Sequence, residues 1–300
     1  MTDDQLLTFL EVARLRSVTR AADALRIGQP TASERLRALE KEVGAPLVAR
    51  RGRGIVLTQA GTAFLPHAQR ARQVLARGVA AARAAGSGAG GRVRLAASVT
   101  AGTYLVAPAL VAFRQAHAGV AVEVRSAHSP DALGLLLDDD VDLALSSGPL
   151  LHPQVARVAR GTGPLVLVAR AGGPWAKARR MTAARLREAP LLVGQWGPAY
   201  RRFLEDVRGE GLVPPRWIEV SPVDLVKAML KADAGVAVLP AVAVREELDR
   251  GTFVELTYED GRLPGWSVVL SRRADVPLDG PVAALATVLT TSVEGLSKGA

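Results

Sequence analysis

The chain of 300 residues contains no cysteine. This absence excludes disulfide scaffolds, zinc ribbons, iron–sulfur clusters, cysteine nucleophiles and thiol-based redox sensors. Histidine is scarce, and no two of His67, His117, His128 and His152 have the spacing of metal ligands, so we expect no metal and no cofactor. No apolar run reaches the roughly 18 residues of a transmembrane helix. The acidic start, MTDDQLL, lacks the pattern of a secretory signal, so we expect a cytoplasmic protein with no membrane partner.

Acidic residues are missing from one long stretch of the chain: none occurs between Glu42 and Glu123. Residues 1–90 contain 14 Lys and Arg against 7 Asp and Glu, a charge of +7, whereas residues 91–300 contain 24 against 22, a charge of +2. A coding preference for arginine would explain Arg in place of Lys, but not the missing acids. A basic front end on a nearly neutral body predicts a DNA-binding module.

The basic front end has the pattern of a helix-turn-helix. Apolar residues at helical spacing predict a helix over 3–16, and Thr19 is predicted to cap a short second helix that Gly28 ends. A third helix is predicted to begin near Gln29 and Pro30, since proline suits a first helical turn. One face of this helix is apolar (Ala32, Leu36, Leu39, Val43), and the opposite face carries Pro30, Ser33, Glu34 and Arg37.

Residues 46–57 predict a small β-wing, because two short apolar pieces flank an Arg- and Gly-rich tip from Arg50 to Arg53. Thr58 is predicted to cap the next helix, and Pro66 to kink it or to mark a joint between two pieces. Its near-heptad apolar positions predict a partner helix: Phe64, Ala68, Ala71, Leu75 and Val79.

The segment from Gly86 to Gly91 has the composition of a hinge. It also matches G-x-G-x-x-G, but a phosphate-binding loop needs a strand before it and a helix after it. The predicted order here is the reverse, so we interpret the segment as a hinge.

From Arg92 onward, strands alternate with helices, which predicts an α/β architecture with mainly parallel sheets. The predicted strands include separate ones at 155–158 and 165–168. Two successive series of strands and helices predict two lobes with a cleft between them. Ligands of such sheets bind outside the carboxyl ends of the strands.

The first ninety residues resemble the winged helix-turn-helix of LysR-type transcriptional regulators. The stretch from Phe9 to Leu65 contains the matching pattern, and "Leu225-Val-Lys-Ala-Met-Leu…Gly235-Val-Ala-Val-Leu-Pro240" is similar to the second lobe of the family's effector domain. The matching residues in the first stretch are Ala21-Ala22, Leu25, Gln29-Pro30, Ser33, Leu39-Glu40, Gly44, Leu47, Arg50 and Leu57-Thr58-x-Ala60-Gly61.

The resemblance implies an N-terminal all-α winged helix-turn-helix with a long linker helix, followed by an α/β, two-lobed, periplasmic-binding-protein-like effector domain. We expect the DNA-binding domain over 1–58, the linker, dimerisation helix and hinge over 59–90, and the effector domain over 91–300. Within that domain, lobe I is expected to span about 91–161 and 267–300, and lobe II about 162–266. The implied partners are double-stranded DNA, a small-molecule effector, further copies of the chain in a dimer or tetramer, and RNA polymerase.

The resemblance also implies the DNA-binding residues. Gln29, Pro30, Thr31 and Ser33 match the start of the family's reading helix, Arg37 lies one turn later, and Arg51 and Arg53 match the wing. Two positions depart from the family: Gly28 stands where Ser is frequent, and Glu34 where a basic residue is common. A carboxylate repels phosphate but can accept from a cytosine amino group, so we expect altered base preference. Arg35 and Arg37 fit a solvated helix face equally well.

Polar residues that follow several predicted strands suggest the effector site. Ser98, Val99 and Thr100 end the first strand of the effector half and precede a helix, whose free N–H groups can hold an anion. Other strands end at Ser146, Ser147, Gln195 and Ser221. Each residue alone fits a helix cap or turn, but several together favour a pocket. His128 fits the cleft or the surface, and Trp196 a pocket wall or the core.

Other functional classes fit less well. An enzyme is not expected, because the chain has no G-x-S-x-G, no Walker A loop and no His and carboxylate metal cluster. A transporter's solute-binding protein would match the lobes but not the basic front end. A molybdate-type regulator would have small β-barrels in place of the βα alternation. The resemblance to LysR-type regulators therefore implies a DNA-binding regulator whose promoter binding is modulated by a small, anionic metabolite in the cleft between the lobes.

Overall fold

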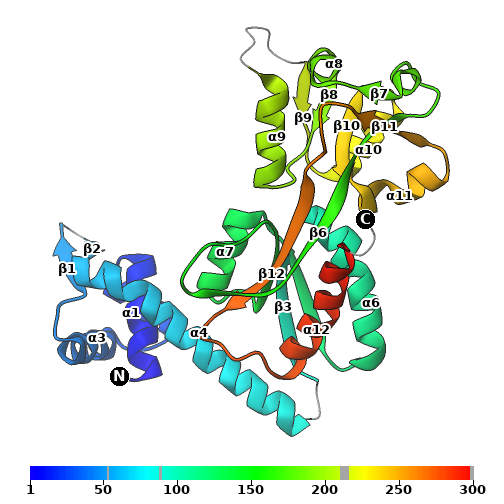
Figure 1. Cartoon of the computed structure of the whole chain (residues 1–300). Coiled ribbons are helices and arrows are strands. Elements are labelled where there is room, and N and C mark those ends of the chain that lie inside the picture. Colours follow the sequence, from blue (N-terminus) through cyan, green and yellow to red (C-terminus); the bar gives the residue numbers. More distant parts are fainter. Residues whose placement is uncertain (53, 88–89, 210–215, 298–300) are drawn as a thin grey trace. The chain divides into compact units, whose positions relative to one another are not determined.

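The computed structural model describes residues 1–52, 54–87, 90–209 and 216–297. Residue contacts divide the chain into two compact units, Met1–Ala89 and Gly90–Ala300 (Figure 1). Each unit has its own buried apolar core, so each is described by itself. Among the described residues, no helix is long and apolar enough to cross a membrane, and no group of three or more His, Asp or Glu could hold a metal ion.

The first unit begins with three helices, α1 (Asp3–Leu15), α2 (Val18–Leu25) and α3 (Gln29–Val43). A capping box at Thr2 starts α1, and Ser17 starts α2 by accepting from the N–H of Arg20. The predicted cap at Thr19 is therefore wrong, because the serine two residues earlier already satisfies the helix N-terminus. Buried apolar side chains of the three helices meet in one core, which includes Leu6, Phe9, Val12, Ala21, Leu36 and Leu39.

A hairpin and a long helix complete the first unit. Strands β1 (Val48–Arg51) and β2 (Gly54–Leu57) pair antiparallel. Helix α4 (Gln59–Ser87) starts where Thr58 accepts from the N–H of Gly61 at 2.9 Å, as predicted. Pro66 lies inside this helix, so the predicted joint is wrong: α4 continues past the proline as one element. Its first turns pack on the core through Phe64 and Ala68.

The second unit contains two half-sheets (Figure 1). In the first, β3 (Arg92–Ala97) lies between β4 (Ala121–Ser126) and β5 (Leu143–Ser147), and all three are parallel. The helical elements of this half are α5 (Val99–Ala101), the π-helical η1 (Gly102–Val106), α6 (Ala107–Ala116), α7 (Ser129–Leu137) and α12 (Gly280–Gly295).

In the second half-sheet, β8 (Leu191–Val193) lies between β10 (Val236–Pro240) and β9 (Trp217–Glu219), again in parallel. Strand β11 (Phe253–Tyr258) pairs with the short β7 (Arg180–Met181). The helical elements here are η2 (Ala176–Ala178), α8 (Ala183–Glu188), α9 (Pro198–Arg208), α10 (Val223–Lys231) and α11 (Ala241–Asp249).

Two long strands, β6 (Val155–Arg170) and β12 (Gly265–Arg273), connect the half-sheets. The first part of β6 pairs with β12, and its last part pairs with β10 and β11. The predicted separate strands at 155–158 and 165–168 are therefore wrong. Glycine is needed at position 161, in the middle of β6, because α12 packs closely there: a Cβ on Gly161 would lie 1.8 Å from the carbonyl oxygen of Val293.

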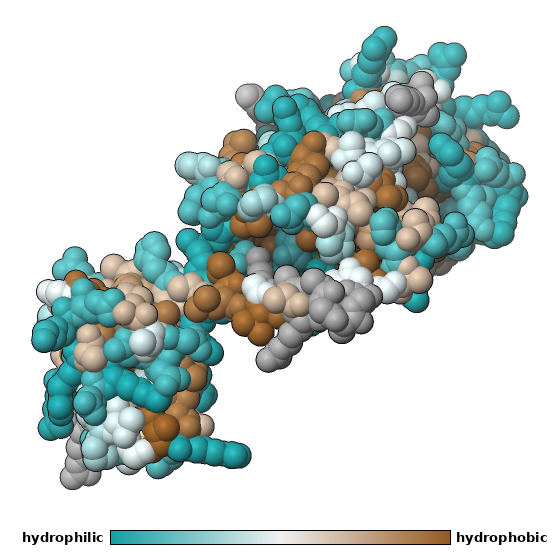
Figure 2. Space-filling model, turned by 90° about the horizontal axis from the view of Figure 1, so that it is seen from below, coloured by the Kyte–Doolittle hydropathy of each residue, from teal (hydrophilic) through white to brown (hydrophobic). Residues whose placement is uncertain are grey.

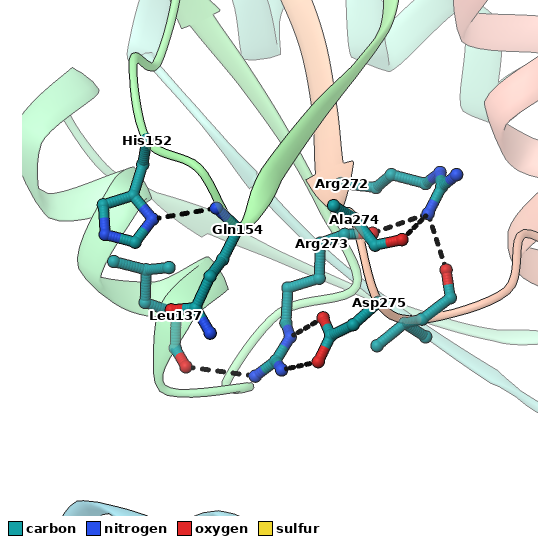
Figure 3. A network of polar contacts seen from close by, with 8 residues as sticks. Leu137, His152, Gln154, Arg272, Arg273, Ala274 and Asp275 are labelled. Atoms are coloured by element: carbon teal, nitrogen blue, oxygen red, sulfur yellow. Dashed lines mark hydrogen bonds and ion pairs between the residues drawn. The ribbon is translucent and has the colours of Figure 1, made fainter.

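Polar contacts fix the end of β12 (Figure 3). The guanidinium of Arg273 bonds the carboxylate of Asp275, with Nε donating at 2.9 Å, and its Nη1 donates to the carbonyl of Leu137 at 3.2 Å. The hydrogen bond with Asp275 raises the pKa of Arg273, and the side chain is buried. The next arginine back, Arg272, donates to the carbonyl of Val276 at 2.6 Å. The bond to Leu137 holds the end of β12 against the end of α7, and the other bonds hold the segment that follows the strand.

Candidate DNA interface and effector cleft

Helix α3 has one buried face and one exposed polar face. Ala32, Leu36 and Leu39 are buried in the core of the first unit. The predicted reading residues lie on the other side: Gln29, Pro30, Thr31, Glu34 and Arg37 are exposed and Ser33 is half-buried. The spacing of these two sets along α3 follows directly from the helical period.

The start of α3 is open to a ligand. Gly28 is the residue before the helix, and no side chain caps the first turn. Helix N-termini attract anions through their free N–H groups and the helix dipole. The side chain of Gln29 donates to the hydroxyl of Ser33 at 3.1 Å, so these two polar groups are oriented together.

The two arginines of α3 differ in their surroundings. Arg35 forms an ion pair with Asp4 of α1 at 2.5 Å, which ties α3 to α1. For Arg37, which is exposed, the described residues provide no ion pair. The sequence left open whether Arg35 and Arg37 contact DNA or belong to a solvated helix face. In the structure, Arg35 forms the intramolecular contact.

The wing brings further cations to the surface. Arg50 and Arg51 are exposed on β1, and Arg51 stands opposite Gly54 in the hairpin. Gly52 has a φ of +60°, a left-handed conformation that glycine adopts without strain. Arg53 lies outside the described residues, so the prediction for this residue stays one from the sequence.

The predicted effector residues of the first half-sheet lie together. Ser98 follows β3, accepts from the N–H of Ala101, and its own N–H donates to the carbonyl of Leu145 at 3.2 Å. Val99 is half-buried and Thr100 is buried. Ser147 ends β5, and its hydroxyl accepts from the indole N–H of Trp266 at 3.1 Å.

The predicted residues of the second half-sheet lie at the ends of two neighbouring strands. Gln195 follows β8 and Ser221 follows β9, and both are exposed. The N–H of Val220 donates to the carbonyl of Val193 at 2.8 Å, which holds the two strand ends side by side.

The ends of β5 and β8 approach each other across the two half-sheets. A Cβ on Gly148 would lie 3.3 Å from Cδ of Pro198, and one on Gly197 would lie 3.4 Å from the carbonyl oxygen of Ser147. The segment just after Gln195 therefore touches the segment of Ser147. Trp196, by contrast, belongs to the core: it is buried, and its indole N–H donates to the carbonyl of Val238 at 2.7 Å.

A second contact between the half-sheets was not predicted from the sequence. Lys227 of α10 donates to the hydroxyl of Tyr104 in η1 at 3.4 Å and forms an ion pair with Glu247 of α11 at 2.8 Å. Burial lowers the pKa of Lys227, but its bonds with Glu247 and Tyr104 outweigh burial and leave that pKa raised. Burial likewise raises the pKa of Glu247, but Lys227 and Lys231 together outweigh this effect, so that pKa is lowered. No local sequence signal connects residues so far apart.

Comparisons with known proteins agree with this architecture. The sequence profile described as "LysR substrate binding domain" matches residues 86–294, and that of "Bacterial regulatory helix-turn-helix protein, lysR family" matches residues 4–62. The chain belongs to the LysR family.

Curated relatives of this LysR-family chain are transcriptional regulators. The RuBisCO operon transcriptional regulator of Allochromatium vinosum is 29% identical over 257 residues, which cover 85% of this chain and 84% of the relative. The HTH-type transcriptional regulator CbbR of Rhodospirillum rubrum is 30% identical over 273 residues, 89% of each chain. These relatives confirm the prediction of a regulator that is not an enzyme.

Solved structures confirm the fold class. Full-length CbnR complexed with its target DNA has a TM-score of 0.64 at 22% identity, covering 97% of this chain and 100% of that chain. A full-length OxyR variant from Pseudomonas aeruginosa has a TM-score of 0.66 at 20% identity, covering 99% and 97%. This LysR-family chain is thus a DNA-binding transcriptional regulator with a winged helix-turn-helix and a two-lobed effector-binding domain.

Proposed function

We propose that the chain regulates a promoter by placing α3 in the major groove and the wing against the phosphates. The observation that carries this proposal is that the polar face of α3 and the arginines of β1, which belong to the same unit, are exposed. Gln29, Pro30, Thr31, Ser33, Glu34 and Arg37 form the reading surface, and Arg51 and Arg53 contact the backbone. Base contacts give specificity and the arginines give affinity, which depends on salt.

The effector is a small anionic metabolite held where the two half-sheets meet. The support is the approach of the Ser147 and Gln195 segments, together with the helix that starts at Ser98. None of the predicted cleft residues, Ser98, Val99, Thr100, Ser147, Gln195 and Ser221, carries a negative charge. Binding changes the relative position of the lobes and thereby the DNA contacts, because a ligand favours the conformation that it binds best.

The regulator acts as a dimer or tetramer in the cytoplasm, with α4 in the dimer contact. Val74, Leu75 and Val79 of α4 are about half exposed, which is unusual for apolar side chains without a partner. Figure 2 shows hydrophobic patches, in brown, on a largely hydrophilic surface. The corresponding division of the chain is 1–58 for DNA binding, 59–90 for the linker, and 91–300 for the effector domain. If the regulator activates transcription, it also contacts RNA polymerase at the promoter.

Sequencing of genomic fragments bound by the purified protein, at two salt concentrations, tests the proposal. We expect a few enriched intergenic sites with two-fold symmetry that persist at the higher salt. Diffuse binding that disappears with salt would refute specific regulation and leave a non-specific basic patch. The genes beside the enriched sites indicate which metabolites to test as effectors.

A further inference from the structure

A cavity of about 200 Å³ lies where β6 and β12 pass from one half-sheet to the other. Its walls come from both halves: η1 and α12 belong to the first, and α11 belongs to the second. The lining includes Leu105, Pro164, Ala241, Val242, Arg245, Trp266 and Leu296. None of the residues predicted for the effector cleft lines this cavity, so it is a separate site.

The lining combines an apolar interior with a single charge. Leu105, Pro164, Val242 and Leu296 present hydrocarbon, and the fully buried Trp266 lies behind this lining. Arg245 is the only charged residue of the lining; it is exposed, and among the described parts of the chain it has no ion-pair partner. No carboxylate lines the cavity. This combination matches a ligand with an apolar body and one negative end.

The volume limits the size of the apolar body. A cavity of about 150 Å³ lined by apolar side chains holds benzene, which has six carbons, so this larger one has room for about six carbons and a carboxylate. A guanidinium binds a carboxylate through two parallel N–H donors, which suits Arg245 to its negative end. We propose that this cavity binds small monocarboxylates of about six carbons, with Arg245 on the carboxylate and the hydrocarbon against Leu105, Val242 and Leu296.

One hydrogen bond connects this site to the proposed effector cleft. Trp266 is one of the lining residues, and its indole N–H donates to the hydroxyl of Ser147 at 3.1 Å. A ligand that shifts the lining at Trp266 therefore acts on the orientation of a cleft residue, and it also contacts both half-sheets. This effect on regulation rests on the proposed function, whereas binding in the cavity does not.

Hexanoate titrated into the full-length protein, followed by calorimetry, tests the site. We expect saturable binding with one site per chain, and at least about tenfold weaker binding of the neutral hexanamide, because the charge-assisted contact is lost. Arg245→Gln should weaken hexanoate binding by a similar factor. Arg250→Gln is the matched control: it removes a charge from the end of the same helix, where Arg250 pairs with Glu246 outside the cavity.

A second variant tests the apolar part without touching the charge. Ala241, at the start of α11, lines the cavity. Ala241→Leu should fill part of the cavity and weaken hexanoate binding. Thermal unfolding of this variant shows whether the protein is folded. No saturable binding of hexanoate, or equal losses in Arg245→Gln and Arg250→Gln, would overturn the proposal. The proposal would also be overturned if Thr100→Val lost hexanoate binding while Arg245→Gln and Ala241→Leu bound hexanoate normally. Hexanoate would then occupy the effector cleft. The genomic-fragment experiment is independent of each of these outcomes.

Discussion

Removal of one wing arginine tests the DNA interface quantitatively. Arg51 ends β1, is exposed, and forms no ion pair within the described part of the first unit. Its replacement in Arg51→Ala removes no buried contact, so the free energy of unfolding should change by less than about 0.5 kcal/mol. The effect of the variant should therefore appear in DNA binding alone.

The expected size follows from counterion release. The logarithm of the binding constant falls with the logarithm of the salt concentration, with a slope of about −0.9 for each phosphate contact. Loss of one contact makes the slope shallower by about 0.9. The affinity deficit of Arg51→Ala should then shrink by about 3.5-fold between about 50 and 200 mM salt, since four to the power 0.9 is about 3.5.

Fluorescence anisotropy with an enriched site and a scrambled duplex measures both slopes. A backbone contact should cost the same affinity on the two duplexes, because phosphates carry no sequence information. Arg208→Ala is the control: Arg208 is an exposed arginine at the end of α9 in the effector domain, so the variant has the same net charge. An unchanged slope for Arg51→Ala, or an equal change for Arg208→Ala, would refute the placement of the wing.

Four further variants test the effector domain and its stability. Thr100→Val should blunt the response to the effector without weakening DNA binding; a normal response would exclude Thr100 from the cleft. Gly161→Ala should destabilise the protein by about 1–3 kcal/mol, because its Cβ would lie 1.8 Å from a carbonyl oxygen of α12. Gly134→Ala in α7 should instead stabilise the protein by about 0.5–1 kcal/mol, because a Cβ there meets nothing within 4 Å. Urea unfolding measures both changes. Since Lys227 keeps the pKa of Glu247 low in the folded state, its contribution to stability is present above the usual pKa of 4.5 and is lost as pH falls through the lower, folded value. Glu247→Gln should therefore lower stability at pH 7 and reduce the loss of stability on acidification; an identical pH profile would contradict the ion pair.

Local patterns predicted the first unit well, because its helices depend on short-range features. The stripe of Ala32, Leu36 and Leu39 identified the buried face of α3, and this also defined the exposed face. Thr58 was correctly identified as a cap. The wrong cap at Thr19 arose because Ser17 and Thr19 are both residue types that cap helices, and the choice depends on the backbone angle at each.

The sequence by itself determined the family, the DNA-binding half and the alternation of strands and helices, since composition, periodicity and caps act within a few residues. Only the tertiary structure decided that β6 is one strand, because its first part pairs with β12 and its last part pairs with β10 and β11. It also decided which arginine of α3 pairs with α1, and it brought Lys227 to Tyr104 and Trp266 to Ser147. Such contacts join residues more than a hundred positions apart, or different helices, and the packing of whole elements creates them.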